Sequence, residues 1–560
     1  MKKLRWQILV VVITLILVGV LLLSQQPVSQ ITTILTQPTS GGVYTEALVG
    51  SMSRFNPLLD RNNAADRDVD RLLFSGLIRF DSRGMPLPDL AEAWGTSQDG
   101  TIYNFSIRPN ALWHDGTPVT ADDVIFTIDL IQNDISFYPQ DVKELWRNVE
   151  IKRLDDKTLQ FRIPEPFVPF LDYLTFGVLP KHLLGNIPAD QIPNAEFNIN
   201  PVGSGPYQFD HLLIDNGQVT GVVLTVFENY HGQKPYIPQI VFRYHPSPTA
   251  ALDAYQQGEV MGISQITSET LNAALSEEDL SIYTSRRPEL SLIFFNLNNN
   301  EVPFFQEVEV RKALLMGLNR QRMIIKLLDG QAILADGTIL PGSWAYYDGL
   351  THFAYDSLEA QSMLKKAGYL STDGGEILAK DGLSLSFTLL HPDDALHTAL
   401  AEYIQRDWAK LGVQVNLSAL PYEQLIHEKL ANRQYEAALV DINLSYTPDP
   451  DPYPFWHQAE AVSGQNYSQW DNRLASEYLE RARVTADIES RARLYRNFQV
   501  IFDQELPALP LYFPTYTFGV DMQVYGVQAA PLYDTSDRLN NIAEWHLLTR
   551  RTLDDATPIP

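Results

Sequence analysis

The segment Tyr103–Val124 constrains the fold most, because it places the signals for a strand, a turn and a helix in one short run. Residues 103–108 alternate apolar and polar side chains, the period-2 pattern of a half-buried strand. The dipeptide Asp115-Gly116 predicts a tight turn, because glycine adopts positive φ without steric cost. Thr120 is typical of a helix N-cap, with Asp123 as the acidic partner of a capping box. The segment predicts regular structure and carries no catalytic pattern.

Length and composition narrow the class of protein. At 560 residues the chain exceeds one ordinary core, so two or more lobes are expected. A hydrophobic fraction of 45% and a charged fraction of 20% are typical of a folded globular protein. The net charge of −26 argues against nucleic-acid binding, which requires a basic face. The sequence has no cysteine, which excludes disulfides, thiol catalysis and cysteine-type zinc sites.

The N-terminus predicts attachment to a membrane. A short basic start, ending at Arg5, precedes the apolar run Trp6–Leu23, and about 17–25 apolar residues span a bilayer. We expect residues 1–23 to form a transmembrane anchor with its basic end cytoplasmic and the folded part extracytoplasmic. A cleaved signal peptide is the alternative, although no clear small-x-small cleavage site lies between Leu23 and Gln30. Residues 24–40 are rich in Gln, Ser, Thr and Pro, which predicts a flexible linker.

Several short motifs occur one after another along the chain. They are Gly76–Asp81, Leu90–Trp94, the Trp-His-Asp-Gly and Val-Thr-Ala-Asp-Asp-Val strings within Trp113–Val124, Pro201–Tyr207, Val310–Arg320 and Asp449–Asp451. With these motifs the chain resembles family 5 of the extracellular solute-binding proteins of ABC importers, which contains dipeptide-, oligopeptide- and nickel-binding proteins. The resemblance covers about residues 42–549. The glycines of Pro201–Tyr207 read as a tight loop before a strand, because their spacing fails both phosphate-loop patterns.

The resemblance implies the fold. It implies an α/β, two-lobe fold of the periplasmic-binding-protein type II-like kind (cluster C), with an inserted third subdomain and a hinged cleft. Lobe I would span residues 41–286, with the insertion over about residues 77–200, and would be completed by residues 513–550. Lobe II would span residues 287–512, and residues 551–560 would form a tail. Two crossings between the lobes would make a hinge, and closure over a ligand is the expected motion.

Residue patterns in the second half support an α/β lobe. Residues 399–411 and 491–505 are predicted as helices from their periodicity. Gly412 ends the first of them, and the alternating residues 413–417 predict a strand. A helix, a glycine and a buried strand in this order are typical of an α/β lobe.

The acidic and aromatic run Tyr446–His457 is the main candidate ligand loop. Its alternating prolines remove backbone donors and favour an extended loop, which either faces the cleft or lies rigidly on the surface with its aspartates capping backbone groups. In peptide-binding members of the family, an aspartate at the position of Tyr446 binds the α-amino group of the ligand. Tyrosine can stack and donate one hydrogen bond but cannot neutralise an ammonium, which argues against a dipeptide with a free N-terminus. Asp441 lies nearby in the sequence and is the less favoured alternative partner.

Other candidates come from two aromatic segments. Phe55 and Asn56 belong to an early segment that the resemblance places at the cleft wall. Trp344 lies in a Pro-x-x-Trp loop, where it could line the cavity or pack in the core. The predicted ligand-binding residues are Phe55, Asn56, Trp344, Tyr446, Asp449 and Trp456.

No enzyme, cofactor or metal site is expected. Asp449 and Asp451 could be read as the carboxylate pair of a hydrolase, but two carboxylates in one proline-locked loop point poorly at both sides of a bond. The sequence has no Gly-x-Ser-x-Gly and no His-Glu-x-x-His motif. Its 11 histidines are scattered along the sequence. His457 is the best single candidate for a metal or haem ligand, but a lone histidine is usually structural.

The sequence thus predicts the membrane-tethered substrate-binding receptor of an ABC importer. The receptor would be a monomer that captures a peptide or a similar-sized solute by lobe closure and delivers it to the membrane permease. A non-transport solute sensor or a peptide-binding chaperone on the same scaffold is the alternative, because an uncleaved anchor also suits a protein that must stay in place. The motifs do not encode the identity of the ligand.

Overall fold

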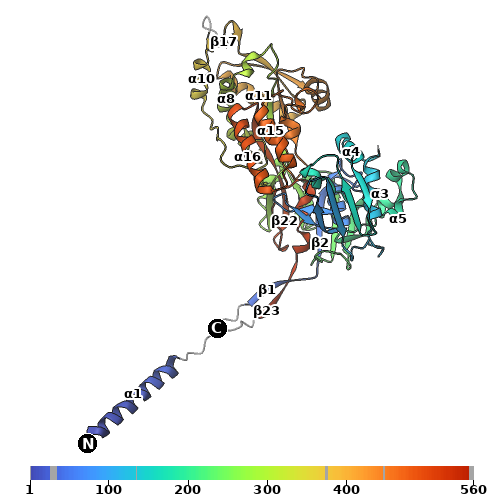
Figure 1. Ribbon diagram of the computed structural model, residues 1–560, viewed down its shortest axis with the longest axis vertical. Helices are drawn as coiled ribbons and strands as arrows, with labels where there is room; N and C mark the ends of the chain where they lie inside the picture. The colour runs from blue at the N-terminus through green and yellow to red at the C-terminus, as the bar shows by residue number, and fades with distance from the viewer. Residues whose placement is uncertain (1, 25–33, 134, 372–375, 446–447, 554–560) are drawn as a thin grey trace.

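The computed structural model describes residues 2–24, 34–133, 135–371, 376–445 and 448–553. One mixed sheet of twelve strands runs through both lobes (Figure 1). Its strands are β2 (Val43–Val49), β9 (Tyr207–Asp215), β10 (Gln218–Val226), β11 (Gln239–His245), β12 (Gly262–Ile266), β13 (Leu280–Arg286), β14 (Glu289–Phe295), β15 (Ala332–Leu334), β19 (Ser386–Pro392), β20 (Gln414–Leu420), β21 (Ala437–Asn443) and β22 (Ala508–Asp521).

Strand β22 is shared by the two lobes. The sheet order is β20-β19-β21-β14-β22-β12-β2-β11-β10-β9, with β13 and β15 also paired to β22. We call the part from β12 to β9, with β13, lobe I and the part from β20 to β14, with β15, lobe II. The first half of β22 pairs with β14, and its second half pairs with β13 and β12. The chain crosses between the lobes at Arg287, whose amide donates to the Pro514 carbonyl at 2.9 Å. The exact limits of the lobes stay a prediction.

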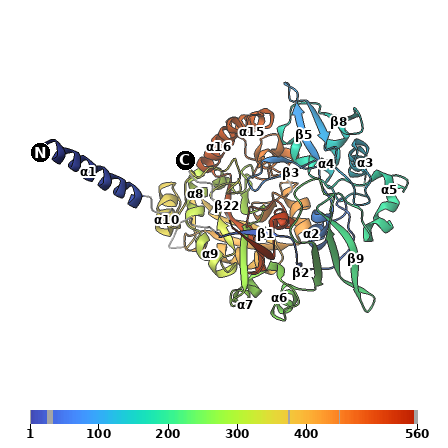
Figure 2. The same ribbon diagram turned by 90° about the horizontal axis from the view of Figure 1, so that it is seen from below.

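An inserted subdomain extends lobe I. Its antiparallel sheet runs β5-β6-β8-β7, and in both overall views it lies on the opposite side of the molecule from helix α10 (Ser357–Lys366; Figures 1 and 2). Lobe I and this subdomain share one hydrophobic core. The insertion consists of β5 (Ala91–Thr96), β6 (Ile102–Ile107), α3 (Ala121–Ile131), α4 (Gln140–Arg147), β7 (Glu150–Arg153), β8 (Thr158–Arg162), α5 (Lys181–Leu184) and short 3-10 turns.

The local predictions for this subdomain are confirmed. Strand β6 and helix α3 occur where alternation and capping predict them. The capping box is formed, because the Thr120 amide donates to Asp123 Oδ2 at 2.8 Å and the Asp123 amide bonds back to the Thr120 cap. Gly116 takes a φ of +87°, a left-handed conformation that suits glycine in a tight turn.

Lobe II packs helices on both faces of its half of the sheet, with one core on each face. Two helices begin earlier than predicted. Helix α11 starts at Ala395 and α16 at Ile488, because Asp394 and Asp487 act as N-caps that accept hydrogen bonds from His397 and Ser490. The helices are α8 (Val308–Met316), α9 (Arg320–Leu327), α10, α11 (Ala395–Ala409), α15 (Arg473–Val484) and α16 (Ile488–Glu505).

The termini differ in part from prediction. Helix α1 (Lys2–Ser24) stands apart from the lobes in Figure 1. Within the part of the chain that the structure describes, no helix has the length and apolar character needed to cross a membrane, so the predicted anchor over residues 1–23 is not confirmed. The predicted flexible linker 24–40 contains strand β1 (Ile34–Thr39). This strand pairs antiparallel with β23 (Leu548–Leu553) and uses the first residues of the predicted tail.

Lobe I holds two neighbouring carboxyl groups, the partly buried Asp60 and the buried Asp70 of helix α2 (Ala64–Leu73). Burial raises the pKa of Asp60 to about 8, against the opposing charge of Arg67. Burial and the neighbouring charge of Asp60 raise the pKa of Asp70 well above its usual range. At neutral pH the folded pair therefore retains a proton that the unfolded chain has released.

The first prediction concerns stability against pH. A pKa raised on folding gives stability that is full below about pH 4 and is lost as the pH rises toward about 8. In Asp70→Asn the free energy of unfolding should fall less steeply as the pH rises from 5 to 8, by up to about 1 kcal/mol per pH unit. Urea unfolding at several pH values measures it. Asp215→Asn, at an exposed strand end, is the control. Parallel pH profiles for Asp70→Asn and wild type would contradict the assignment.

Candidate functional site

A cavity of ≈ 120 Å³ lies where the inserted subdomain, lobe II and the end of lobe I meet. The insertion contributes residues between 167 and 173, and Tyr533 comes from the return to lobe I. Lobe II contributes residues from 338–343, 442–444 and 448–456, together with Arg483. The cavity therefore lies between parts of the chain that can separate only if the lobes move.

The proline loop at residues 448–456 forms one wall, and both of its aspartates are partnered. Asp449 is 8% exposed and accepts a hydrogen bond from Arg491 Nη1 at 2.5 Å and one from the Tyr495 hydroxyl at 3.2 Å. Asp451 accepts from Arg483 Nε at 2.7 Å. These ion pairs fix the loop and leave neither carboxylate placed as the free acid or base of a hydrolase.

The two lobes touch through a carboxylate. The amide of Asp449 donates to Asp172 Oδ2 of the inserted subdomain at 2.9 Å. Burial and the nearby charge of Asp449 raise the pKa of Asp172 well above its usual range. Burial also raises the pKa of Asp449, against the opposing charge of Arg491. The contact places the carboxyl groups of Asp172 and Asp449 close together. Their repulsion favours the protonated form of one of them.

Arg483 carries the positive charge of the cavity wall. Its guanidinium lies 3.5 Å from the centre of the Tyr453 ring and 5.5 Å from that of Phe167 in the inserted subdomain. A cation over an aromatic face is attracted by the ring quadrupole. Phe167, Asp172 and Arg483 have no sequence motif that marks them, so sequence analysis missed all three.

The predicted tryptophans take different places. Trp456 lines the cavity, is 1% exposed and packs on Phe294 and Phe502. The Trp344 ring lies 5.6 Å from the ring of Tyr495, and the Trp344 amide donates to the Arg83 carbonyl of lobe I at 3.3 Å. Trp344 therefore supports the loop from behind and joins the lobes, while its neighbour Ser343 lines the cavity.

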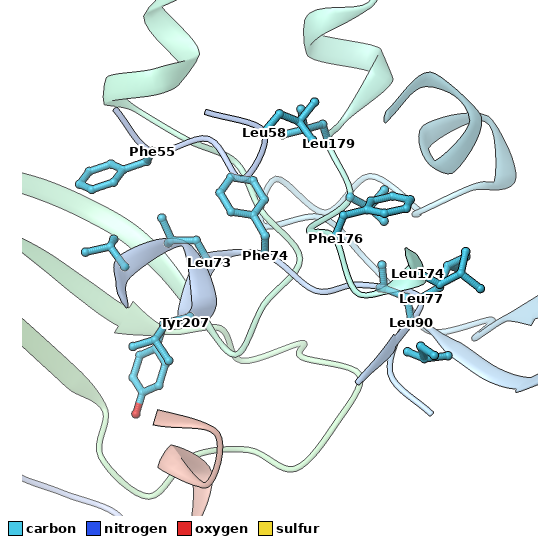
Figure 3. Packing of buried hydrophobic residues seen from close by; sticks show 14 of the residues in the cluster. Phe55, Leu58, Leu73, Phe74, Leu77, Leu90, Leu174, Phe176, Leu179 and Tyr207 are labelled. Carbon is cyan, nitrogen blue, oxygen red and sulfur yellow. The ribbon is translucent and has the colours of Figure 1, made fainter. Parts of the chain in front are cut away.

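Phe55 and Asn56 do not reach the cavity. Both are fully buried in lobe I, and Figure 3 shows Phe55 in the cluster of buried hydrophobic residues that includes Leu58 and Phe74. The Asn56 side chain donates to Asn198 Oδ1 at 3.0 Å and accepts from the Leu58 amide. Their side chains stabilise the early segment, because the apolar ring and the satisfied amide both belong to the core.

Three further candidate site residues remain. One lies outside the described residues, and the side chains of the other two contact charged neighbours. Tyr446 lies outside the described residues. His457 bonds to Glu480 at 3.0 Å and stacks on Tyr453, as expected of a structural histidine. Asp441 lies 3.2 Å from His397. Over the described residues, no group of three or more histidine or acidic side chains is arranged to hold a metal ion.

Strand β21 leaves part of one edge open beside the cavity. It pairs with β14 along its whole length but with β19 at Ala437 and Ala438 alone among its residues. In the described part of the chain, no strand pairs with the other edge of residues 439–443, and Ile442 and Asn443 line the cavity. An open strand edge offers backbone donors and acceptors to an extended chain.

Comparison with known proteins agrees with this geometry. A family model described as "Bacterial extracellular solute-binding proteins, family 5 Middle" matches residues 86–464. The oligopeptide-binding protein AppA of Bacillus subtilis (strain 168) is 27% identical over 520 residues, which cover 91% of this chain and 92% of that protein. The dipeptide-binding protein of Escherichia coli (strain K12) is 27% identical over 508 residues, 86% of this chain and 91% of that protein.

Solved structures share the fold. The structure of AppA from Bacillus subtilis in complex with a nonapeptide has a TM-score of 0.66 at 25% identity and covers 91% of this chain and 100% of its own. HbpA2 from Haemophilus parasuis has a TM-score of 0.77 at 21% identity, covering 89% and 99%, and supports the fold alone. The predicted two-lobe, type II-like α/β fold is confirmed.

The second prediction concerns the ion pair beneath the proline loop. Arg491→Met leaves Asp449 buried without its cation and should destabilise the protein by about 3–5 kcal/mol. Adding Asp449→Asn to this variant should restore part of the loss, because the uncompensated charge is removed. Urea denaturation measures both variants, with Arg493→Met, exposed on the same helix, as the control. An Arg491→Met variant as stable as this control would disprove the role of the pair.

Proposed function

Because the chain belongs to family 5 of the bacterial extracellular solute-binding proteins, we propose that it is the substrate-binding receptor of an ABC importer for peptides. Two relatives of nearly the same length are named for binding an oligopeptide and a dipeptide, which supports this substrate class. The receptor captures a peptide outside the cytoplasm and passes it to a membrane permease. It acts as a monomer and performs no covalent step.

The observation that carries the proposal is the cavity between the lobes beside the open edge of β21. An extended peptide adds to residues 439–443 as a further strand, and its side chains enter the space between the proline loop and the inserted subdomain. Asp449 and Trp456 form the lobe II wall of this space. Tyr446, five residues after Asp441 in the chain, stays a predicted ligand contact, and Trp344 supports the wall.

Closure follows from the shared strand. The lobes rotate about the crossings at Arg287 and Pro514, and closing brings Asp172 against the amide of Asp449. Opening breaks that contact and gives solvent access to the cavity. A receptor must release its ligand, and a contact that buries a carboxyl group keeps the closed state from being too stable in the absence of a peptide.

We also propose that the N-terminal segment holds the receptor at the membrane. The support is the sequence itself, in which a basic start precedes the apolar run Trp6–Leu23. Membrane fractionation and N-terminal sequencing test this. The intact N-terminus should occur in the membrane fraction, whereas a mature protein that begins after Leu23 and is released from cells would show a cleaved leader.

The function itself is tested by native mass spectrometry of the full-length chain in detergent, followed by denaturation and identification of what is released. Short peptides should be found. Adding such peptides to emptied protein should reduce its radius of gyration in solution scattering, because the lobes close. Protein that binds no peptide and does not compact would disprove the proposal, and a single non-peptide solute would replace the substrate class.

The third prediction is a pH dependence of affinity. Burial and the charge of Asp449 raise the pKa of Asp172 where the lobes meet. We expect separation of the lobes to remove both causes, so that closure takes up a proton. The groups that face it are Asp449, Asp451 and Arg491. Peptide affinity should therefore fall as the pH rises above about 4, by at most about tenfold per pH unit.

Asp172→Asn should remove this pH dependence and leave affinity near its low-pH value. Calorimetric titration with one peptide at several pH values measures it, and Asp190→Asn, exposed in the same subdomain, is the control. An unchanged pH profile in Asp172→Asn would refute the coupling.

A further inference from the structure

Three hydroxyl groups that line the cavity between the lobes have no hydrogen-bond partner within the part of the chain that the structure describes. They are Thr338 Oγ1, Ser343 Oγ and the hydroxyl of Tyr533. Their residues are only 6%, 8% and 9% exposed, so bulk water does not replace the missing partners. A buried hydroxyl without a partner costs free energy. Three such groups around one cavity of ≈ 120 Å³ therefore indicate a polar occupant.

These hydroxyl groups come from both lobes. Two of them belong to the segment that follows β15 in lobe II, and Tyr533 belongs to the return to lobe I. A turn of lobe I lies beside both Ser343 and Tyr533. A Cβ atom on Gly84 would stand 2.8 Å from the Tyr533 hydroxyl, and the Trp344 amide, next to Ser343, donates to the Arg83 carbonyl at 3.3 Å. An occupant that bonds to hydroxyl groups of both lobes thus joins the lobes when they are closed.

The charged groups of the cavity wall compensate one another. Asp449 is paired with Arg491, and Asp451 is paired with Arg483. Asp172 also lines the cavity, and its burial raises its pKa, which favours the uncharged form. A charged side chain in this space would find no free opposite charge, and its removal from water would be costly. The occupant is therefore expected to be neutral.

An apolar occupant would not satisfy the hydroxyl groups. Phe167, Leu340 and Trp456 provide apolar wall, but an aliphatic side chain against them would leave all three hydroxyls unpaired. A primary amide has two N–H donors and an accepting oxygen, and a hydroxyl group can both donate and accept. The side chain of asparagine or glutamine can therefore bond to all three hydroxyls and brings no charge.

We propose that Thr338, Ser343 and Tyr533 select peptides in which the side chain enclosed by the cavity is a primary amide. The enclosed residue lies beside Ile442 and Asn443, which belong to the open edge of β21 and line the cavity. Because the hydroxyls come from both lobes, the amide stabilises the closed state in addition to backbone pairing along β21. This inference rests on the proposed function and names the class of peptide that the same cleft prefers.

Calorimetric titration of the full-length chain with matched tripeptides tests it. Trialanine with asparagine at each position in turn locates the enclosed residue, and leucine or aspartate then replaces asparagine at the position where it strengthens binding most. These three side chains have similar shapes but are amide, apolar and charged. The wild-type chain should bind the asparagine peptide about tenfold more tightly than the other two, because leucine leaves the hydroxyls unpaired and aspartate brings an uncompensated charge.

Variants of the hydroxyl residues complete the test. Tyr533→Phe should lower the ratio of affinities for the asparagine and leucine peptides by about threefold, and its combination with Ser343→Ala and Thr338→Val should bring the ratio to about one. Without peptide, Tyr533→Phe should unfold at a temperature no lower than wild type, because the lost hydroxyl had no partner. A purely structural hydroxyl would lower that temperature and leave the ratio unchanged. Tyr525→Phe, exposed in the same return segment, is the control and should change neither.

Equal affinities of the wild-type chain for the asparagine and leucine peptides would overturn the amide selection and leave the receptor function intact, since the hydroxyls would then bind water only. A ratio unchanged in the triple variant would do the same. If the triple variant does not fold, the criterion applies to Tyr533→Phe alone. A wild-type chain that binds none of these peptides, and releases no peptide on denaturation, would overturn both proposals.

Discussion

Strand β22 is the constraint on which the rest of the structure depends, because one continuous strand belongs to both lobes. Proline at position 514 has no amide to donate, yet its carbonyl accepts from Arg287 at the return crossing. The two crossings are thus joined by a hydrogen bond at a single place. We expect relative motion of the lobes to be a rotation about this place, in which groups remote from it travel farthest.

Buried arginines keep the lobe II half of β22 in position. Arg320, 3% exposed, donates from Nη1 to the carbonyls of Pro510 in β22 and Ala335. Arg311 donates from Nε to the Leu506 carbonyl at 2.9 Å, where the chain leaves α16 with a positive φ of 44°. These guanidinium groups satisfy carbonyls that irregular backbone would otherwise leave unpaired. These bonds hold the lobe II half of β22 in one position, as the proposed closure of the lobes requires.

Local chemistry was predictable from the sequence where neighbouring residues determine it. The Thr120–Asp123 capping box and the Gly116 turn involve residues a few positions apart, so periodicity and capping rules found them. The cavity could not be found in this way. Asp172 meets Asp449 across 277 positions, and Phe167 meets Arg483 across lobes, so neither partner carries a local signal. The burial of Phe55 and Asn56 in the core of lobe I was not predictable either, because a resemblance places a segment but does not say which way its side chains point.

The proline loop combines a restricted backbone with paired charges. Its prolines lack backbone donors and stiffen the loop, and arginines bind both of its aspartates. Charges that are already paired cannot bind the ammonium of a peptide without losing their cations. Asp441, on the strand edge that an extended peptide would follow, lies 3.2 Å from His397 and is partnered in the same way. Because Tyr446 cannot neutralise an ammonium, the open backbone edge of residues 439–443 is the feature that supports the proposed peptide capture.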